Sequence, residues 1–131
     1  MKNVLFVCVE NACRSQIGEA FFRKFADGKA LAKSAGVEPS KEVNPKAVAV
    51  MREVGIDISR RKPKLLTTDM VKEADRVVTM GCGVDACPVL PVETEDWQIE
   101  DPSGKSIDKF REIREEIKRR VEELIEELGL R

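Results

Sequence analysis

The hydrophobic positions of the chain follow two different periodicities. Short, largely apolar runs at residues 4–7 and 76–80 are typical of buried parallel strands, whose two faces are both covered. At residues 15–25 and 107–128 the apolar side chains recur three and four positions apart, which indicates amphipathic helices. The pattern therefore predicts that strands alternate with helices along the chain.

Capping and turn residues predict further helices and strands between these segments. Asn44 suits an N-cap, Pro45 the first helical position and Gly55 the position after a helix, so a helix is expected between them. The remaining segments have weaker patterns: a second strand at 31–34, a short helix from 68 or 69 to 74, a fourth strand at 88–92 and a loop at 93–105. Together these segments supply enough strands for one small sheet.

The alternation of strands and helices predicts an α/β fold, a three-layer sandwich with a central four-stranded parallel sheet. We expect residues 1–131 to form one domain, because a chain of 131 residues is long enough to bury its own core. Binding sites of such sheets form at the carboxyl ends of the strands. The loops after residues 4–7 and 76–80 both follow strands and both contain cysteine, so we expect them to open on the same edge.

The charge balance and the lengths of the apolar runs limit which binding partners and which cellular compartment we expect. The formal net charge is −1, which argues against a nucleic-acid-binding protein because such proteins carry a clustered basic excess. No stretch approaches the length of a membrane span, and the apolar run at 4–9 is too short for a signal peptide. We therefore expect a cytoplasmic protein, and a monomer. In that reducing compartment four cysteines suit catalysis, redox chemistry, metal binding or burial better than a permanent disulfide framework.

The segment after the first strand has the features of an oxyanion site with a nucleophile. Cys8 ends the apolar run, and Arg14 and Ser15 follow at the start of the predicted helix. Loop N–H groups, the helix N-terminus and the Arg14 guanidinium can converge on one tetrahedral anion, and the same field stabilises a thiolate at Cys8. Ser15 can donate a hydrogen bond to that sulfur, and Asn11 can hold the shape of the loop. The alternative is a cysteine that is merely buried at a strand end. The expected oxyanion-binding residues are Val9, Glu10, Asn11, Ala12, Cys13, Arg14 and Ser15.

The Cys8-x5-Arg14-Ser15 pattern resembles the phosphate-binding loop of the low-molecular-weight protein tyrosine phosphatase superfamily. The resemblance covers essentially the whole chain, and it implies the fold of that family with Cys8 as nucleophile. Asp101, which is followed by Pro102, lies where the superfamily keeps its general acid. Further segments that resemble the superfamily are residues 34–36 (SAG), 44–48 (NPKAV) and 57–59 (DIS).

Four residues near the predicted site are not explained by phosphatase chemistry. Glu10 stands where the phosphatases usually carry glycine, and Ser103 stands where they usually carry a tyrosine that holds an aromatic substrate. Cys13 either packs behind the loop or serves as a spare thiol that traps Cys8 on oxidation. Lys64 is either a solvated lysine or, because some relatives hold a cation beneath the loop, a source of positive charge there.

Cys82 and Cys87 lie five positions apart, and phosphatase chemistry needs neither thiol. The pair is compatible with a disulfide relay, with two small buried residues, or with part of a zinc site, although the chain has no histidine. The pair resembles the additional cysteines of the thioredoxin-coupled arsenate reductases, which share the phosphatase fold and usually have a somewhat longer loop between the two. Trp97 and residues 100–106 (EDPSGKS) match that branch as well.

The resemblance to the arsenate reductases implies a two-stage reaction. The Cys8 thiolate attacks arsenate while Asp101 protonates the departing oxygen; Cys82 then attacks the Cys8 sulfur, and arsenite leaves. Cys87 attacks Cys82 next, and a thioredoxin-like protein reduces the resulting bridge. The expected ligand is arsenate, with phosphate and sulfate as analogues, and no metal ion, organic cofactor, nucleic acid or membrane is implied. The alternatives are a phosphatase that acts through a Cys8 phosphoenzyme and a sensor that binds an oxyanion and oxidises without turnover.

Overall fold

A computed structural model describes residues 1–81 and 94–130 of the chain. The four strands form one parallel sheet in the order β2-β1-β3-β4, so the expected α/β class and parallel sheet are confirmed. In chain order the elements are β1 (Asn3–Cys8), α1 (Arg14–Ala26), β2 (Leu31–Gly36), α2 (Pro45–Arg52), α3 (Thr68–Glu73), β3 (Arg76–Thr79), β4 (Thr94–Asp96) and α4 (Ile107–Glu127).

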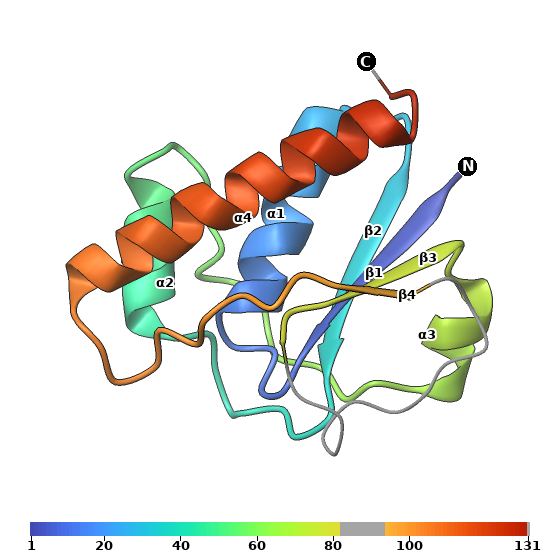
Figure 1. Ribbon diagram of the computed structural model, residues 1–131. Coiled ribbons are helices and arrows are strands. Elements are labelled where there is room, and N and C mark those ends of the chain that lie inside the picture. The colour runs from blue at the N-terminus through green and yellow to red at the C-terminus, as the bar shows by residue number, and fades with distance from the viewer. Residues whose placement is uncertain (82–93, 131) are drawn as a thin grey trace.

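Different helices cover the two faces of the sheet (Figure 1). α1, α2 and α4 lie together on one face, and α3 lies on the other. In β1, Val4, Phe6 and Cys8 belong to the larger core with α1 and α4, whereas Leu5 and Val7 pack with α3, because successive strand side chains alternate between faces. Cys8 therefore lies at the carboxyl end of β1, on the face that α1 covers.

The edge strand β4 differs from the sequence expectation. The loop expected at 93–105 is wrong at Thr94–Asp96, which pairs in parallel with β3. All three residues of β4 are polar and exposed, so neither an apolar run nor an alternating pattern marks this strand. The fourth strand expected at 88–92 lies outside the described residues.

Side chains cap the starts of α2 and α4. Oδ1 of Asn44 accepts a hydrogen bond of 2.9 Å from the backbone N–H of Lys46 at the start of α2, and Oγ of Ser106 accepts one of 3.2 Å from Lys109 at the start of α4. Among the helices of residues 1–81 and 94–130, none combines the length and the apolar character that a membrane crossing requires.

Gly36 ends β2 directly beside the loop that follows β1, and it has no room for a side chain. A Cβ atom there would lie 2.6 Å from the carbonyl oxygen of Val9 and 2.8 Å from the backbone nitrogen of Asn11. We predict that Gly36→Ala displaces the loop, lowers the free energy of unfolding by about 1–3 kcal/mol and weakens phosphate binding about tenfold or more. Urea unfolding and isothermal titration calorimetry with phosphate measure the two effects.

Gly18→Ala is the matched control for this variant. Its Cβ atom would meet the side chains of Met80 and Phe6, at 2.8 and 3.0 Å, rather than the backbone of the loop. This variant is expected to change stability but to keep the affinity for phosphate within about twofold. An unchanged phosphate affinity in Gly36→Ala would contradict the prediction.

Candidate active site

The loop that connects β1 to α1 has its carbonyl groups turned outward. The carbonyl oxygens of Val9, Glu10 and Ala12 accept hydrogen bonds of 2.8–3.1 Å from backbone N–H groups within residues 38–44. Because the described peptide bonds are all trans, the N–H group of each of these peptide units points the opposite way. The N–H groups of Glu10, Asn11 and Cys13 are therefore directed inward, where they can bind an oxyanion together with the N-terminus of α1.

Cys8 is buried at the end of β1, and two side chains support its sulfur. Oγ of Ser15 lies 2.9 Å from Sγ of Cys8, and Nδ2 of Asn11 donates to the same hydroxyl oxygen at 2.7 Å. Because Ser15 already accepts from Asn11, its own proton is free to point at the sulfur. A hydrogen bond to the thiolate favours the charged, nucleophilic form of the cysteine.

Asn11 is itself held by the segment that precedes α3. Its backbone has a φ of 53°, in the left-handed region that asparagine tolerates better than most residues. Its Oδ1 accepts hydrogen bonds from the backbone N–H of Lys64 at 2.9 Å and from Nε2 of Gln16 at 3.1 Å. Lys64 therefore supports the loop through its backbone, whereas its side chain is exposed.

A buried ion cluster anchors the same segment beneath the loop. Glu19 of α1 is fully buried; its Oε2 accepts from Arg61 at 2.5 Å and from Arg23 at 2.7 Å, and its Oε1 accepts from Oγ of Ser34 at 2.5 Å. The guanidinium groups compensate the cost of burying the carboxylate. The basic side chain of this segment that reaches Glu19 is that of Arg61, which the sequence does not distinguish from its basic neighbours.

Arg14 begins α1, and its guanidinium is almost fully buried. Nη1 donates to the carbonyl oxygens of Met80 at 2.6 Å and Ile99 at 2.8 Å, and Nη2 lies 3.9 Å from Oδ2 of Asp101. Arg14 therefore ties the loop to the end of β3 and to the segment that follows β4. The Asp101 side chain is 53% exposed, and its Oδ1 accepts a hydrogen bond of 3.0 Å from the backbone N–H of Ser103.

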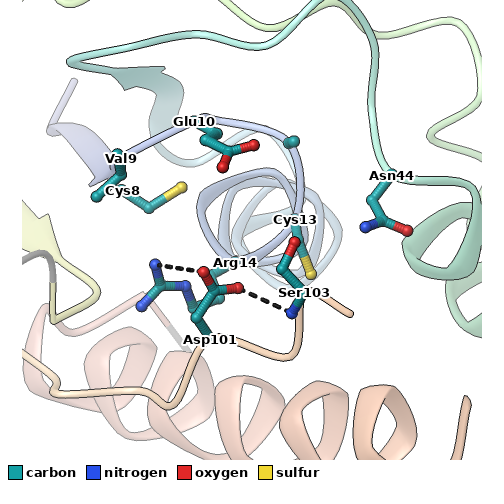
Figure 2. Close-up of a pocket in the computed structure, with 9 residues that line it drawn as sticks. Cys8, Val9, Glu10, Cys13, Arg14, Asn44, Asp101 and Ser103 are labelled. Atoms are coloured by element: carbon teal, nitrogen blue, oxygen red, sulfur yellow. Dashed lines mark hydrogen bonds and ion pairs between the residues drawn. The ribbon is translucent and has the colours of Figure 1, made fainter. Parts of the chain in front are cut away.

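These segments enclose one pocket, which Figure 2 shows in close-up. The structure brings together Cys8, Arg14 and Asp101, which come from three parts of the chain. A sulfur, a guanidinium and a carboxyl group around one pocket can attack, hold and protonate a tetrahedral oxyanion. Sequence reasoning missed Asn44 as a pocket residue, because its role as a helix cap already explained it. The lining residues are Cys8, Val9, Glu10, Ala12, Cys13, Arg14, Asn44, Asp101 and Ser103.

Cys13 also lines the pocket, but its surroundings disfavour a thiolate. Burial raises the pKa of the Cys13 thiol far above its ordinary value, and the neighbouring Cys8 raises it further. Cys13 therefore keeps its proton and is a poor nucleophile. Cys82 and Cys87 lie outside the described residues. Within residues 1–81 and 94–130, no group of three or more His, Cys, Asp or Glu side chains is arranged to hold a metal ion.

The contact between Ser15 and Cys8 predicts a change in thiol reactivity. In Ser15→Ala the thiolate loses a hydrogen bond, and such bonds to charged groups are worth about 1.5–3 kcal/mol. We predict that the rate of Cys8 alkylation by iodoacetamide at neutral pH falls about tenfold. Peptide mass spectrometry after timed quenching measures this rate at Cys8 separately from the other thiols.

Ser34→Ala provides the control for this experiment. Ser34 is buried as fully as Ser15, but its hydroxyl donates to Glu19 and not toward the sulfur. Ser34→Ala is therefore expected to lower stability and leave the alkylation rate of Cys8 unchanged. Equal alkylation rates in the parent and in Ser15→Ala would show that Ser15 does not stabilise the thiolate.

Known proteins that share this fold carry more than one activity. Residues 3–131 match the family model described as low molecular weight phosphotyrosine protein phosphatase. The glutaredoxin arsenate reductase of Synechocystis sp. is 43% identical over 132 residues, which cover 98% of this chain and all of that protein. A solved thioredoxin-dependent arsenate reductase of Corynebacterium glutamicum has a TM-score of 0.84 at 40% identity, covering 99% of this chain and 63% of that one. An arginine phosphatase from Geobacillus stearothermophilus has a TM-score of 0.88 at 28% identity, covering 98% of this chain and 94% of that one.

Backbone similarity does not separate the two activities, because a reductase and a phosphatase superpose on the chain almost equally well. Sequence identity is higher to the reductases, at 43% and 40% against 28% for the phosphatase. The family model spans the site and both flanking layers of the fold. The chain belongs to the low molecular weight phosphotyrosine protein phosphatase family, in which its sequence is more similar to these arsenate reductases than to the arginine phosphatase.

Proposed function

We propose that this chain reduces arsenate to arsenite, with a thioredoxin-like protein as the electron donor. The observation that carries the proposal is full-length similarity to an arsenate reductase at 43% identity. The site geometry supports it, because the pocket places a cysteine among N–H donors and a guanidinium that suit a tetrahedral oxyanion. The sequence supports it further through Cys82 and Cys87, two thiols that hydrolysis does not require.

The first stage is a nucleophilic attack within the pocket. The Cys8 thiolate attacks arsenic, while the Arg14 guanidinium and the loop N–H groups stabilise the charge on the oxyanion. Asp101 gives a proton to the oxygen that leaves on the side away from the sulfur, so that it departs as water. Its hydrogen bond from the Ser103 N–H fixes the orientation of the carboxyl group at the pocket, and its side chain is partly exposed. The product is a covalent adduct between the Cys8 sulfur and arsenate.

The second stage is the reduction. The Cys82 thiolate attacks Sγ of Cys8, and the bond between sulfur and arsenic breaks with its electron pair staying on arsenic, which leaves as arsenite. Arsenic gains the two electrons that the thiols lose in forming the Cys8–Cys82 disulfide. Cys87 then attacks Cys82, which frees Cys8 and moves the disulfide to Cys82–Cys87. A dithiol protein reduces that outer bridge and restores the starting enzyme.

Residues 1–131 act as one domain and as a monomer in the cytoplasm. The thiols carry the electrons, so the reaction requires neither a metal ion nor an organic cofactor. Phosphate and sulfate occupy the pocket as unreactive analogues of arsenate.

A phosphatase is the second candidate, and the description of the family model favours it. Cys8, Arg14 and Asp101 suffice to form a phosphoenzyme, and water then takes the place of Cys82 as the second attacking group. The first chemical step is shared, so an active reductase can retain slow ester hydrolysis. The two candidates differ in whether turnover depends on Cys82.

A coupled assay tests the proposal. Arsenate-dependent oxidation of NADPH is measured with thioredoxin and thioredoxin reductase, and in parallel with glutaredoxin, glutathione and glutathione reductase. We predict turnover in the parent and a loss of at least about a hundredfold in Cys82→Ser and in Cys87→Ser, since each removes a required attacking thiol. Hydrolysis of para-nitrophenyl phosphate by the same variants is expected to stay within about twofold of the parent.

Two outcomes would contradict the reductase. One is the absence of arsenate turnover with either donor, together with ester hydrolysis that does not depend on Cys82; this outcome favours the phosphatase. The other is no turnover in either assay, which favours a sensor that binds the oxyanion and oxidises reversibly. Cys8→Ser serves as the common negative control, because both reactions begin at this sulfur.

A further inference from the structure

The mouth of the pocket carries two carboxylates, an unusual feature for a site that binds anions. Glu10 and Asp101 both line it, and Figure 2 shows the Glu10 carboxylate turned toward the pocket rather than away from it. Asp101 acts as a proton donor in the proposed reaction, whereas the side chain of Glu10 has no role in that reaction. A carboxylate beside an anion is repulsive unless a hydrogen lies between the two.

A free oxyanion supplies that hydrogen and a phosphate monoester does not. Inorganic phosphate and arsenate keep a hydroxyl group at neutral pH, whereas a monoester loses its last acidic proton near about pH 6. An anion that gives three oxygens to the loop N–H groups and Arg14 would have its fourth oxygen directed toward the mouth. A hydroxyl group there can donate a hydrogen bond to a carboxylate. An ester oxygen has no hydrogen to donate, so it and the carboxylate oxygen are both acceptors and repel each other.

We propose that Glu10 is a specificity-determining residue that selects a free, hydroxyl-bearing oxyanion over a phosphate monoester. The inference deepens the proposed function and rests on it for the identity of the substrate. It assigns a role to the Glu10 side chain that is separate from the loop N–H groups.

Asn44 contributes a donor to the same mouth. Its Oδ1 is occupied by the backbone N–H of Lys46 at 2.9 Å, as the cap of α2. Figure 2 shows the amide nitrogen of Asn44 on the side that faces the pocket. Nδ2 can therefore donate to an oxygen of the bound anion while Glu10 accepts from its hydroxyl group. Such a donor and acceptor pair matches the hydroxyl-bearing face of an inorganic oxyanion.

An organic group gains nothing at this mouth to offset the repulsion. Among the described residues that line the pocket, none carries an aromatic ring. The organic group of an aryl ester would leave through the mouth past Glu10, Asn44 and Ser103, without a ring against which to stack. Repulsion at Glu10 and the lack of stacking therefore both weaken the binding of a phosphate monoester relative to a free oxyanion.

The shape of the loop does not depend on the Glu10 side chain, which makes the residue a good target for substitution. Its carbonyl oxygen accepts from the backbone N–H of Ser40 at 3.1 Å, a contact that any side chain retains. The side chain itself is exposed. Glu10→Gln removes the charge at nearly constant size.

Calorimetry with a matched pair of ligands tests the inference without turnover. Inorganic phosphate and methyl phosphate are titrated into the reduced protein at about pH 8, where both are mainly dianions and only phosphate keeps a hydroxyl group. The parent is expected to bind phosphate at least about tenfold more tightly than methyl phosphate, and Glu10→Gln is expected to reduce this ratio at least about fivefold. Glu42→Gln removes the same charge from an exposed position of the adjacent segment and is expected to keep the parental ratio.

Three results would overturn the inference: a parental ratio near unity, an unchanged ratio in Glu10→Gln, or an equal change in Glu42→Gln. If Glu10→Gln binds neither ligand, Glu10→Ala takes its place in the same comparison. Neither ligand is reduced in this experiment. A chain that fails to reduce arsenate but shows the expected change in ratio therefore refutes the proposed function and retains the inference about Glu10.

Discussion

The hydrogen bonds that hold the loop carbonyl groups outward are the constraint on which the site depends. Backbone N–H groups of residues 38–44 bind the carbonyl oxygens of Val9, Glu10 and Ala12. With the carbonyl groups engaged on one side, the trans peptide units present N–H groups on the other. A buried cysteine alone would be inert. Cys8 lies at the end of β1, beside these donors and the N-terminus of α1, and therefore faces a site that favours negative charge. Gly36 allows the close approach, because any Cβ atom there would collide with the loop backbone.

A second layer of contacts fixes the side chains that act on Cys8. Ser15 can direct its proton at the sulfur because Asn11 already donates to its oxygen, and Asn11 is held in turn by the backbone of Lys64. The cluster of Glu19 and Arg61 fastens that segment to α1. Cys8 is therefore supported by contacts between parts of the chain that are distant in sequence, and this arrangement suits the first step of either proposed reaction.

Local patterns were sufficient to predict much of this molecule. Apolar runs predicted β1 and β3, and Asn44 with Pro45 predicted the start of α2. The apolar side chains spaced three and four positions apart predicted α4 almost to its last residue. Contacts between distant segments were not predictable in this way. The polar strand β4 is defined by its pairing with β3 and not by a local pattern. Arg61 rather than Lys64 reaches Glu19, and this depends on how the segment before α3 packs against α1. The motif identified Cys8, Arg14 and Asp101, but only the fold shows that Asn44 lines the same pocket.

In the proposed reaction the electrons for reduction come from the thiols of the chain itself. A single-turnover experiment tests it most directly: the fully reduced protein is mixed with arsenate in the absence of any reductase, arsenite is quantified, and the remaining free thiols are alkylated and mapped. Close to one equivalent of arsenite per chain is expected, because one disulfide yields two electrons. Cys82 and Cys87 are expected to be protected while Cys8 is alkylated. No arsenite with all thiols still free, or arsenite formed equally well by Cys82→Ser, would refute the thiols as the source of the electrons.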